Sequence, residues 1–111
     1  MLTRSHRFIG RDAVKPVLRS GKKLRGDGFS LRYMPVTTSR SRFAVVVSKK
    51  VDKRAVVRNR IRRRVYSVCE EYLDRQPPLD VAFIVYDKTL ADIPHDRLTQ
   101  RVTSTLDTVF A

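Results

Sequence analysis

The residues best suited to chemistry lie between positions 53 and 64, where seven of the twelve side chains are lysine or arginine. The segment from Arg58 to Arg64 reads Arg-Asn-Arg-Ile-Arg-Arg-Arg, and no acidic residue occurs between Asp52 and Glu70. Guanidinium groups bind phosphate through paired N–H···O bonds and also stack on bases. A solvated helix face normally mixes charges of both signs. The pattern therefore favours contact with nucleic acid.

An apolar stripe runs through the same segment and predicts a helix from about residue 54 to residue 75. Its members recur at spacings of 4, 4, 3 and 4, which places them on one helix face: Val57, Ile61, Val65, Val68 and Tyr72. At 100° per residue, four other side chains project from the opposite face: Asn59, Arg62, Arg63 and Tyr66. The stripe would anchor the helix to a core and leave the guanidinium groups for a ligand.

The aromatic side chains have different expected roles. The ring of Tyr66 would either stack on a base, a contact worth about 1–3 kcal/mol, or pack on the stems of neighbouring arginines. The sequence does not decide between these alternatives. The phenylalanines are predicted to be core residues, as large apolar side chains usually are: Phe29, Phe43, Phe83 and Phe110.

Length and charge describe the chain as a whole. Its 111 residues predict one domain, residues 1–111, with a single modest core. The net charge of +13 would destabilise a compact fold through self-repulsion, which indicates an anionic partner. Residues 1–64 contain 20 lysines and arginines against 3 acids, whereas residues 65–111 contain 4 against 8. We interpret this asymmetry as one basic face on a single nucleic-acid-binding fold.

Several classes of protein are disfavoured. A single cysteine, Cys69, excludes an internal disulfide and a cysteine-rich zinc site. No apolar run approaches the roughly 20 residues of a membrane span, so no membrane partner is expected. Arg4 and Arg7 are not followed by an apolar segment, so no secretory signal is predicted and a cytoplasmic location is expected.

Signals for an enzyme with its own catalytic residues are weak. His6 and His95 are isolated from acid–base partners in the sequence, and no phosphate-binding glycine loop or zinc-ligand spacing is present. Asp80, Asp87 and Asp92 do not form a recognisable metal-binding set. The residues alone therefore predict a binding protein with no catalytic residues and no metal site.

The remaining elements follow from periodicity and turn residues. We expect a short helix over residues 12–20, strands over 29–34, 43–48 and 81–86, and a last helix that begins at residue 95 or 96. That last helix has one apolar face: Leu98, Val102, Thr105, Leu106 and Val109. Strands 43–48 and 81–86 are apolar on both faces, which is typical of central strands. The predicted fold class is α+β. Its elements are a helix, two or three strands, a helix, a strand and a helix, which is the order αβββαβα when three strands precede the long helix. Residues 43–86 are predicted to form a parallel strand–helix–strand crossover.

The central motif resembles the signature of the bacterial ribonuclease P protein component. It consists of three segments: Ser48-Lys49-Lys50, Arg54-Ala55 and Arg58-Asn59-Arg60-Ile61-Arg62-Arg63. The likeness extends to two further segments, His6-Arg7-Phe8, which precedes a short helix ending at Gly21, and Phe29-Ser30-Leu31. The resemblance therefore covers nearly the whole chain.

The resemblance implies a small two-layer α–β sandwich whose basic helix lies in a left-handed βαβ crossover, although right-handed crossovers are the rule. It also implies the accessory protein subunit of an endoribonuclease that removes the 5′ leader from precursor tRNA. In that family a large RNA subunit performs the hydrolysis with Mg²⁺. The implied partners are ribonuclease P RNA and precursor tRNA, and the protein would raise affinity for substrate and for Mg²⁺.

The resemblance also assigns roles to residues. Eight positions match the RNA-binding motif: Lys49, Lys50, Arg54, Arg58, Asn59, Arg60, Arg62 and Arg63. Four positions would border the cleft that holds the leader: Val14, Leu18, Ser30 and Arg32. The family often has aromatic residues at the positions of Val14, Leu18 and Arg32, so stacking on the leader should be weaker here and electrostatic contact stronger. Arg64 and Tyr66 also depart from the family pattern, which has an apolar and then a basic residue.

Three other functions share some of these features. A ribosomal or other structural RNA-binding protein would have the same charge but would not stimulate tRNA processing. A DNA-binding module is disfavoured because the apolar stripe commits the long helix to a core, so no DNA partner is expected. A stand-alone nuclease is disfavoured by the missing catalytic residues.

Overall fold

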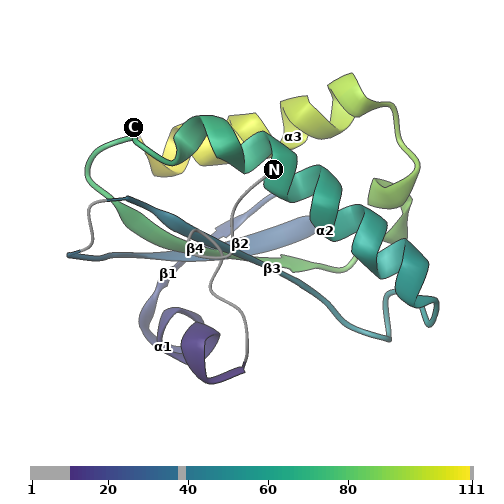
Figure 1. The fold of residues 1–111 in the computed structure, drawn as a ribbon, viewed down its shortest axis with the longest axis horizontal. Helices are drawn as coiled ribbons and strands as arrows, with labels where there is room; N and C mark the ends of the chain where they lie inside the picture. Colours follow the sequence, from purple (N-terminus) through teal and green to yellow (C-terminus); the bar gives the residue numbers. More distant parts are fainter. Residues whose placement is uncertain (1–10, 38–39, 111) are drawn as a thin grey trace.

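The computed structural model of the chain describes residues 11–37 and 40–110, and side chains from residue 14 onwards within those ranges. The segment His6-Arg7-Phe8, to which the resemblance extends, lies outside the described residues. Seven helices and strands follow one another in the predicted order (Figure 1): α1 (Arg11–Ser20), β1 (Lys22–Arg25), β2 (Phe29–Pro35), β3 (Arg42–Val47), α2 (Ala55–Cys69), β4 (Leu79–Val85) and α3 (His95–Val109).

Two short 3₁₀ helices, η2 (Glu70–Tyr72) and η3 (Lys88–Ala91), were not expected. The long α-helix ends at Cys69, earlier than the predicted residue 75, because the chain tightens into η2. In η2 the N–H of Leu73 bonds to the carbonyl of Glu70. Tyr72 and Leu73 are both buried after this change of winding, so the apolar stripe continues although the α-helix does not.

The four strands form one mixed sheet in the order β1-β2-β4-β3. Strand β3 runs parallel to β4, whereas the β1–β2 and β2–β4 pairs are antiparallel. The predicted parallel crossover through α2 is therefore confirmed. Its left-handed sense stays a prediction.

Strand β3 lies at an edge of the sheet, so the prediction of a central strand was wrong for residues 43–48. The reason is that apolar residues on both faces show that each face of the strand is covered. They do not show whether another strand pairs with each of its edges. Phe43 and Val45 lie in the main core, and Ala44 packs in a second cluster on the other face. Strand β4 is central as predicted.

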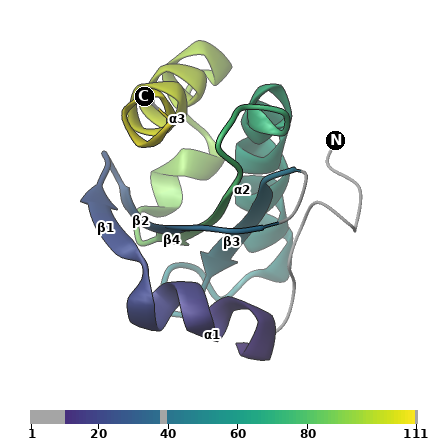
Figure 2. The ribbon, with the colours of Figure 1, turned by 90° about the vertical axis from the view of Figure 1, so that its left-hand side faces the viewer.

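Helices cover both faces of the sheet. Figure 2 shows α2 and α3 side by side on one face and α1 on the other. The main core lies under α2 and α3 and contains the four predicted phenylalanines: Phe29, Phe43, Phe83 and Phe110. The smaller cluster under α1 consists of buried and partly buried residues: Val14, Val17, Ala44, Ala82, Leu18 and Met34. The predicted α+β class and the order αβββαβα are confirmed, whereas α1 on the second face makes three layers and not the two expected.

The stripe of α2 packs as predicted. Ile61, Val65 and Val68 are buried, while Val57 packs against the core from a half-buried position. Burial of one such side chain stabilises a fold by about 1.5–3 kcal/mol. The stripe therefore holds α2 rigidly against the sheet. No helix in the described part of the chain combines the length and the apolarity that crossing a bilayer requires.

Candidate nucleic-acid interface

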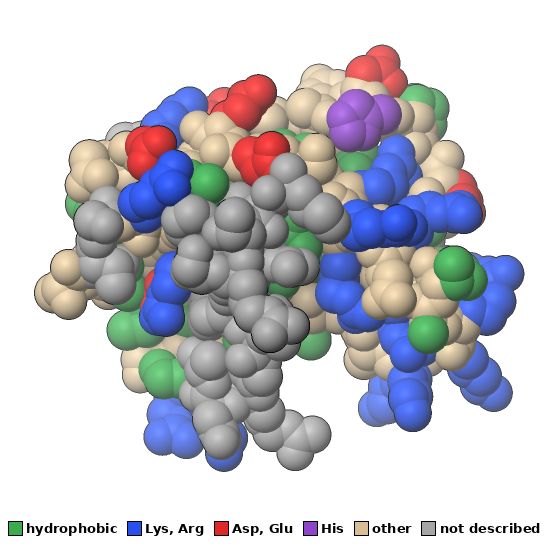
Figure 3. Space-filling model, in the orientation of Figure 1, with side chains coloured by type: hydrophobic (Ala, Val, Ile, Leu, Met, Phe, Trp, Pro, Cys, Tyr) green, Lys and Arg blue, Asp and Glu red, His purple; other side chains and the backbone are tan. Residues whose placement is uncertain are grey.

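The eight residues predicted to bind RNA lie on α2 and on the turn that leads into it, and we call them the basic surface. Figure 3 shows lysine and arginine side chains gathered over the N-terminal half of α2. The first turn of α2 contains no acidic residue, and its N-cap, Arg54, makes no side-chain capping bond. The positive end of the helix dipole therefore adds to the charge of the side chains.

Arg54 and Arg58 hold the turn before α2. Arg54 pairs with Asp52 at 3.0 Å, and its backbone N–H donates to the same carboxylate at 2.9 Å. The side-chain hydrogen bond from Arg54, followed by the backbone bond, lowers the pKa of Asp52 to about 2. Arg58 donates from Nη1 to the carbonyl oxygens of Asp52, at 3.0 Å, and Lys53, at 2.8 Å. Arg58 is therefore also a positioning residue.

The other members of the basic surface are less engaged. Arg60 meets Asp92 at 3.2 Å, but both side chains are at least half exposed, and such pairs contribute little. Arg62 donates to the side-chain oxygen of Asn59. For the remaining three residues the structure records no hydrogen bond or ion pair with described side chains: Lys49, Lys50 and Arg63. The surface therefore keeps cations that are available to an external anion.

Tyr66 does not belong to this surface, so its predicted projection with the arginines was wrong. The side chain is only 6% exposed, and its hydroxyl oxygen accepts a hydrogen bond of 3.1 Å from the N–H of Val45. Cys69, one turn further along, is also buried. The buried arc of α2 is thus wider than the stripe in its second half, because the helix lies against edge strand β3. Base stacking by Tyr66 is excluded in this conformation.

Arg64 also has a structural role that the sequence did not reveal. Its Nη1 donates to the carbonyl oxygen of Leu90 at 2.6 Å, and its Nη2 donates to that of Ile93. The fork thereby joins α2 to η3 and the turn after it. A signal was present in the spacing, since Arg64 lies three residues after Ile61 and therefore flanks the buried stripe.

The four residues predicted to border the leader cleft belong to one side of the sheet. Ser30 and Arg32 alternate with buried Phe29 and Leu31, so they face α1 and are half-buried. Val14 is buried in the cluster beneath α1 and offers little surface to a ligand. Leu18 and Met34 pack against the same cluster from half-buried positions.

The floor of this side of the sheet is cationic. Lys23 pairs in register with Arg32, and Arg25 pairs with Ser30. Because residues paired across neighbouring strands point to the same face, these two exposed cations join Arg32 there. A row of cations of this kind can hold a phosphate backbone.

Three titratable groups outside the basic surface have structural roles. Cys69 is free and fully buried, and burial raises the pKa of its thiol well above the usual value. Asp80 pairs with Arg42 at 2.6 Å, and Asp87 caps η3 through Thr89. The described residues contain no group of three or more His, Cys, Asp or Glu side chains that could hold a metal ion.

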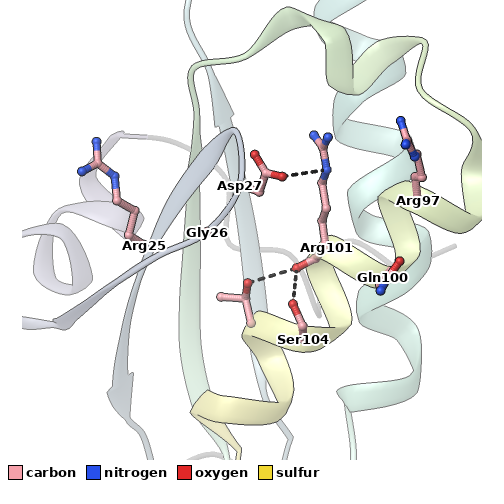
Figure 4. Close-up of a pocket in the computed structure, with 8 residues that line it drawn as sticks. Arg25, Gly26, Asp27, Arg97, Gln100, Arg101 and Ser104 are labelled. Carbon is pink, nitrogen blue, oxygen red and sulfur yellow. Dashed lines mark hydrogen bonds and ion pairs between the residues drawn. The ribbon is translucent and has the colours of Figure 1, made fainter.

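A shallow polar site, separate from the basic surface, lies between the β1–β2 turn and α3 (Figure 4). Its lining residues include Arg25, Asp27, Arg97 and Arg101. Arg101 pairs through Nε with Asp27 at 3.2 Å, and Figure 4 shows Arg97 to the right of this pair, also on α3. The strand order places β1 at the opposite edge of the sheet from β3. Arg97 is an exposed cation on α3, outside the eight residues of the basic surface.

Comparison with known proteins extends these observations. A protein family model described as Ribonuclease P matches residues 2–109. The "Ribonuclease P protein component" of Synechococcus elongatus is 42% identical over 81 residues, which cover 69% of this chain and 66% of that protein. The protein of the same name from a Picosynechococcus species is 32% identical over 77 residues, with the same two coverages. The chain thus spans 66% of the length of these curated relatives.

Solved structures agree in fold. The RNase P protein of Staphylococcus aureus superposes with a TM-score of 0.80 over 94% of each chain, at 17% identity. The RNase P protein of Thermotoga maritima gives a TM-score of 0.74 over 85% of this chain and 88% of that one, at 19% identity. These TM-scores establish a shared fold. Because the family model matches residues 2–109, the chain belongs to the ribonuclease P family of proteins.

Proposed function

We propose that this chain is the protein subunit of a cytoplasmic ribonuclease P ribonucleoprotein, which removes the 5′ leader of precursor tRNA. The observation that supports this most directly is the basic surface, whose exposed cations are held on a helix anchored by its buried stripe. The family membership and the names of the curated relatives support the same function. The protein would bind both the catalytic RNA and the leader.

The binding mechanism follows from polyelectrolyte behaviour. RNA carries condensed counterions, and each phosphate that a lysine or arginine neutralises releases part of them. Lys49, Lys50 and Arg63 have no recorded partner among the described residues, so no internal ion pair must break before they bind. Arg54 and Arg58 keep the turn before α2 in place, and the Arg54 side chain is still 71% exposed. Affinity should therefore fall steeply as salt rises.

The leader is expected to lie across the face of the sheet that α1 shares. A single-stranded leader has no groove to read, so a cationic surface with few base-specific contacts is sufficient. Ser30, Arg32, Lys23 and Arg25 provide such a surface. This face of the sheet would bind the leader of the substrate, and the basic surface would bind the RNA subunit.

Magnesium belongs to the RNA subunit in this proposal, where it would activate the attacking water and stabilise the leaving oxygen. The described residues offer no cluster of protein ligands for it. The contribution of the protein would be electrostatic: Arg62, Arg63 and their neighbours would neutralise phosphates and let two RNAs approach each other. No side chain of the chain is assigned a catalytic role.

Reconstitution tests this function. The chain is mixed with a bacterial ribonuclease P RNA at low Mg²⁺, and cleavage is measured on precursor tRNAs with a long leader and with a leader of one nucleotide. We expect the chain to stimulate cleavage, and to raise substrate affinity more for the long leader. Binding to the RNA without stimulation would instead indicate a structural RNA-binding protein. Cleavage by the chain alone would indicate a nuclease with its own catalytic residues.

A further inference from the structure

Helix α1 covers only part of its side of the sheet. It packs on Ala44 and Ala82, which are paired in register, and on Met34. Two residues further along each strand, another row crosses the sheet in register: Val46, Ile84, Ser30 and Arg25. Val46 is 37% exposed, although Ala44 is buried. The end of the sheet face marked by this row is therefore open, and we call it the open end.

Tyr86 extends the open end. It follows Val85, the last residue of β4, and the alternation that turns Ala82 and Ile84 toward α1 turns Tyr86 the same way. Its side chain is 49% exposed, and it is the only exposed tyrosine or phenylalanine among the side chains that the structure describes. An aromatic ring here is thus accessible from the same side as Arg32.

Two hydrogen bonds fix the position of Tyr86. Its backbone N–H donates to the carbonyl of Gly28 at 3.1 Å, and its hydroxyl donates to the carbonyl of Phe29 at 3.3 Å. The hydroxyl bond draws the ring across the start of β2. Because the backbone and the hydroxyl of Tyr86 are both hydrogen-bonded while one face of its ring is exposed, the side chain should lose little conformational entropy when a base stacks on it.

Cationic residues lie at the same end of the sheet as this ring. Because β3 and β4 are parallel and in register, their carboxyl ends meet at one end of the sheet, so Lys49 and Lys50 follow β3 where Tyr86 follows β4. Arg25 stands in the row at the open end. The nearby carboxylate of Asp87 accepts bonds from the N–H and the hydroxyl of Thr89, at 2.9 and 2.7 Å.

We propose that Tyr86 stacks on a base of the unpaired 5′ leader, and that Val46 and Ile84 complete an apolar platform beside it. The inference rests on the proposed function and adds a specific subsite to it. The charge of the surroundings selects the occupant, because cations next to an exposed ring fit the phosphates and bases of single-stranded RNA. Val14, Leu18 and Arg32 provide no ring on this face, so Tyr86 supplies the stacking surface.

The test uses the reconstituted holoenzyme and measures affinity for three precursor tRNAs: one with a normal leader, one whose leader nucleotides lack bases, and one with a single leader nucleotide. For Y86A we expect a loss of about tenfold in affinity for the normal leader alone. Y86F keeps the ring and should retain most of the affinity. V56A removes an apolar side chain that is 61% exposed but lies on α2, and serves as the control.

The outcomes separate the two proposals. If Y86A retains the full leader dependence of the unmodified protein, the stacking role is overturned and the proposed function stands. If the unmodified protein itself shows no leader dependence, the proposed function fails. If Y86A does not fold, as judged by its affinity for ribonuclease P RNA, the unmodified protein alone tests the stacking role. Equal affinity for the normal and the base-free leader overturns stacking. Weaker affinity for the base-free leader supports it.

Discussion

The hydroxyl group of Tyr66 accepts a hydrogen bond from the N–H of Val45, which belongs to the edge strand β3. An edge strand has backbone groups that no neighbouring strand satisfies, and a buried N–H without an acceptor is costly. Tyr66 therefore satisfies one such group and covers the strand. At this position the chain uses an aromatic residue for stability, although its neighbours Arg62 and Arg63 belong to the basic surface.

Replacement of Tyr66 by Phe tests this role. The variant keeps the buried ring but leaves the N–H of Val45 without an acceptor, so the free energy of unfolding should fall by about 1–3 kcal/mol. Equilibrium urea denaturation measures the change. Tyr33→Phe is the matched control, because no hydrogen bond of the Tyr33 hydroxyl is recorded among the described residues. Weaker RNA binding by folded Tyr66→Phe, without loss of stability, would contradict this assignment.

The arginines of α2 differ in what their guanidinium groups contact. Arg58 and Arg64 donate to backbone carbonyls, whereas Arg63 has no recorded partner among the described residues. The sequence could show that these cations cluster, but it could not show this division. The partners of Arg64 are 26 and 29 residues away along the chain, and only the fold brings them together.

At the scale of elements, Arg64 links α2 to η3. The two carbonyl groups that it satisfies belong to Leu90, within η3, and to Ile93, in the turn that precedes α3. A planar fork can reach both groups at once, which a single ammonium group cannot do with the same geometry. The link therefore helps to fix where α3 begins relative to α2.

Replacement of Arg64 by Ala should loosen this connection. We expect a loss of about 2 kcal/mol in the free energy of unfolding, since hydrogen bonds to charged groups are lost. Amide hydrogen exchange should become faster in the segment of residues 88–93 than in the sheet. Arg64→Lys should restore only part of the protection. Unchanged exchange in this segment would show that the fork does not hold it.

Periodicity predicted some elements well and missed others. The stripe of α2 and the apolar face of α3 appeared in the sequence because their residues repeat at helical spacing and are buried as expected. Strand β1 had no such signal, since three of the four residues of Lys22–Arg25 are cationic. It forms because the turn over Gly26 and Gly28 returns the chain onto β2. Gly28 has a φ of 93°, which favours glycine.

The candidate site was predictable to a similar degree. The basic motif lies on α2 and the preceding turn as expected, because the stripe and the charge pattern are both local. The open end of the sheet face was not predictable, because it depends on how far α1 extends over β3 and β4. Tyr86 was expected inside a strand that is apolar on both faces, and only the structure shows that it is exposed.

At the scale of the whole molecule, the fold partly pairs the basic and acidic halves of the chain. Arg40, Arg42 and Arg60 form ion pairs with Asp74, Asp80 and Asp92, respectively. These pairs neutralise only some of the excess in a chain of net charge +13. Exposed cations remain on the basic surface and on β1, which leaves these regions attractive to a polyanion.

The salt dependence of RNA binding tests this account most directly. The dissociation constant for a bacterial ribonuclease P RNA is measured over a range of salt concentrations for the unmodified chain, Arg63→Ala and Arg97→Ala. Both variants lose one exposed arginine, but Arg97 lies on α3 beside the shallow polar site and not on the basic surface. We predict that Arg63→Ala reduces the magnitude of the slope of the log association constant against log salt by about 1. Arg97→Ala should leave this slope unchanged. Equal slopes for the two variants would contradict the claim that the basic surface binds RNA.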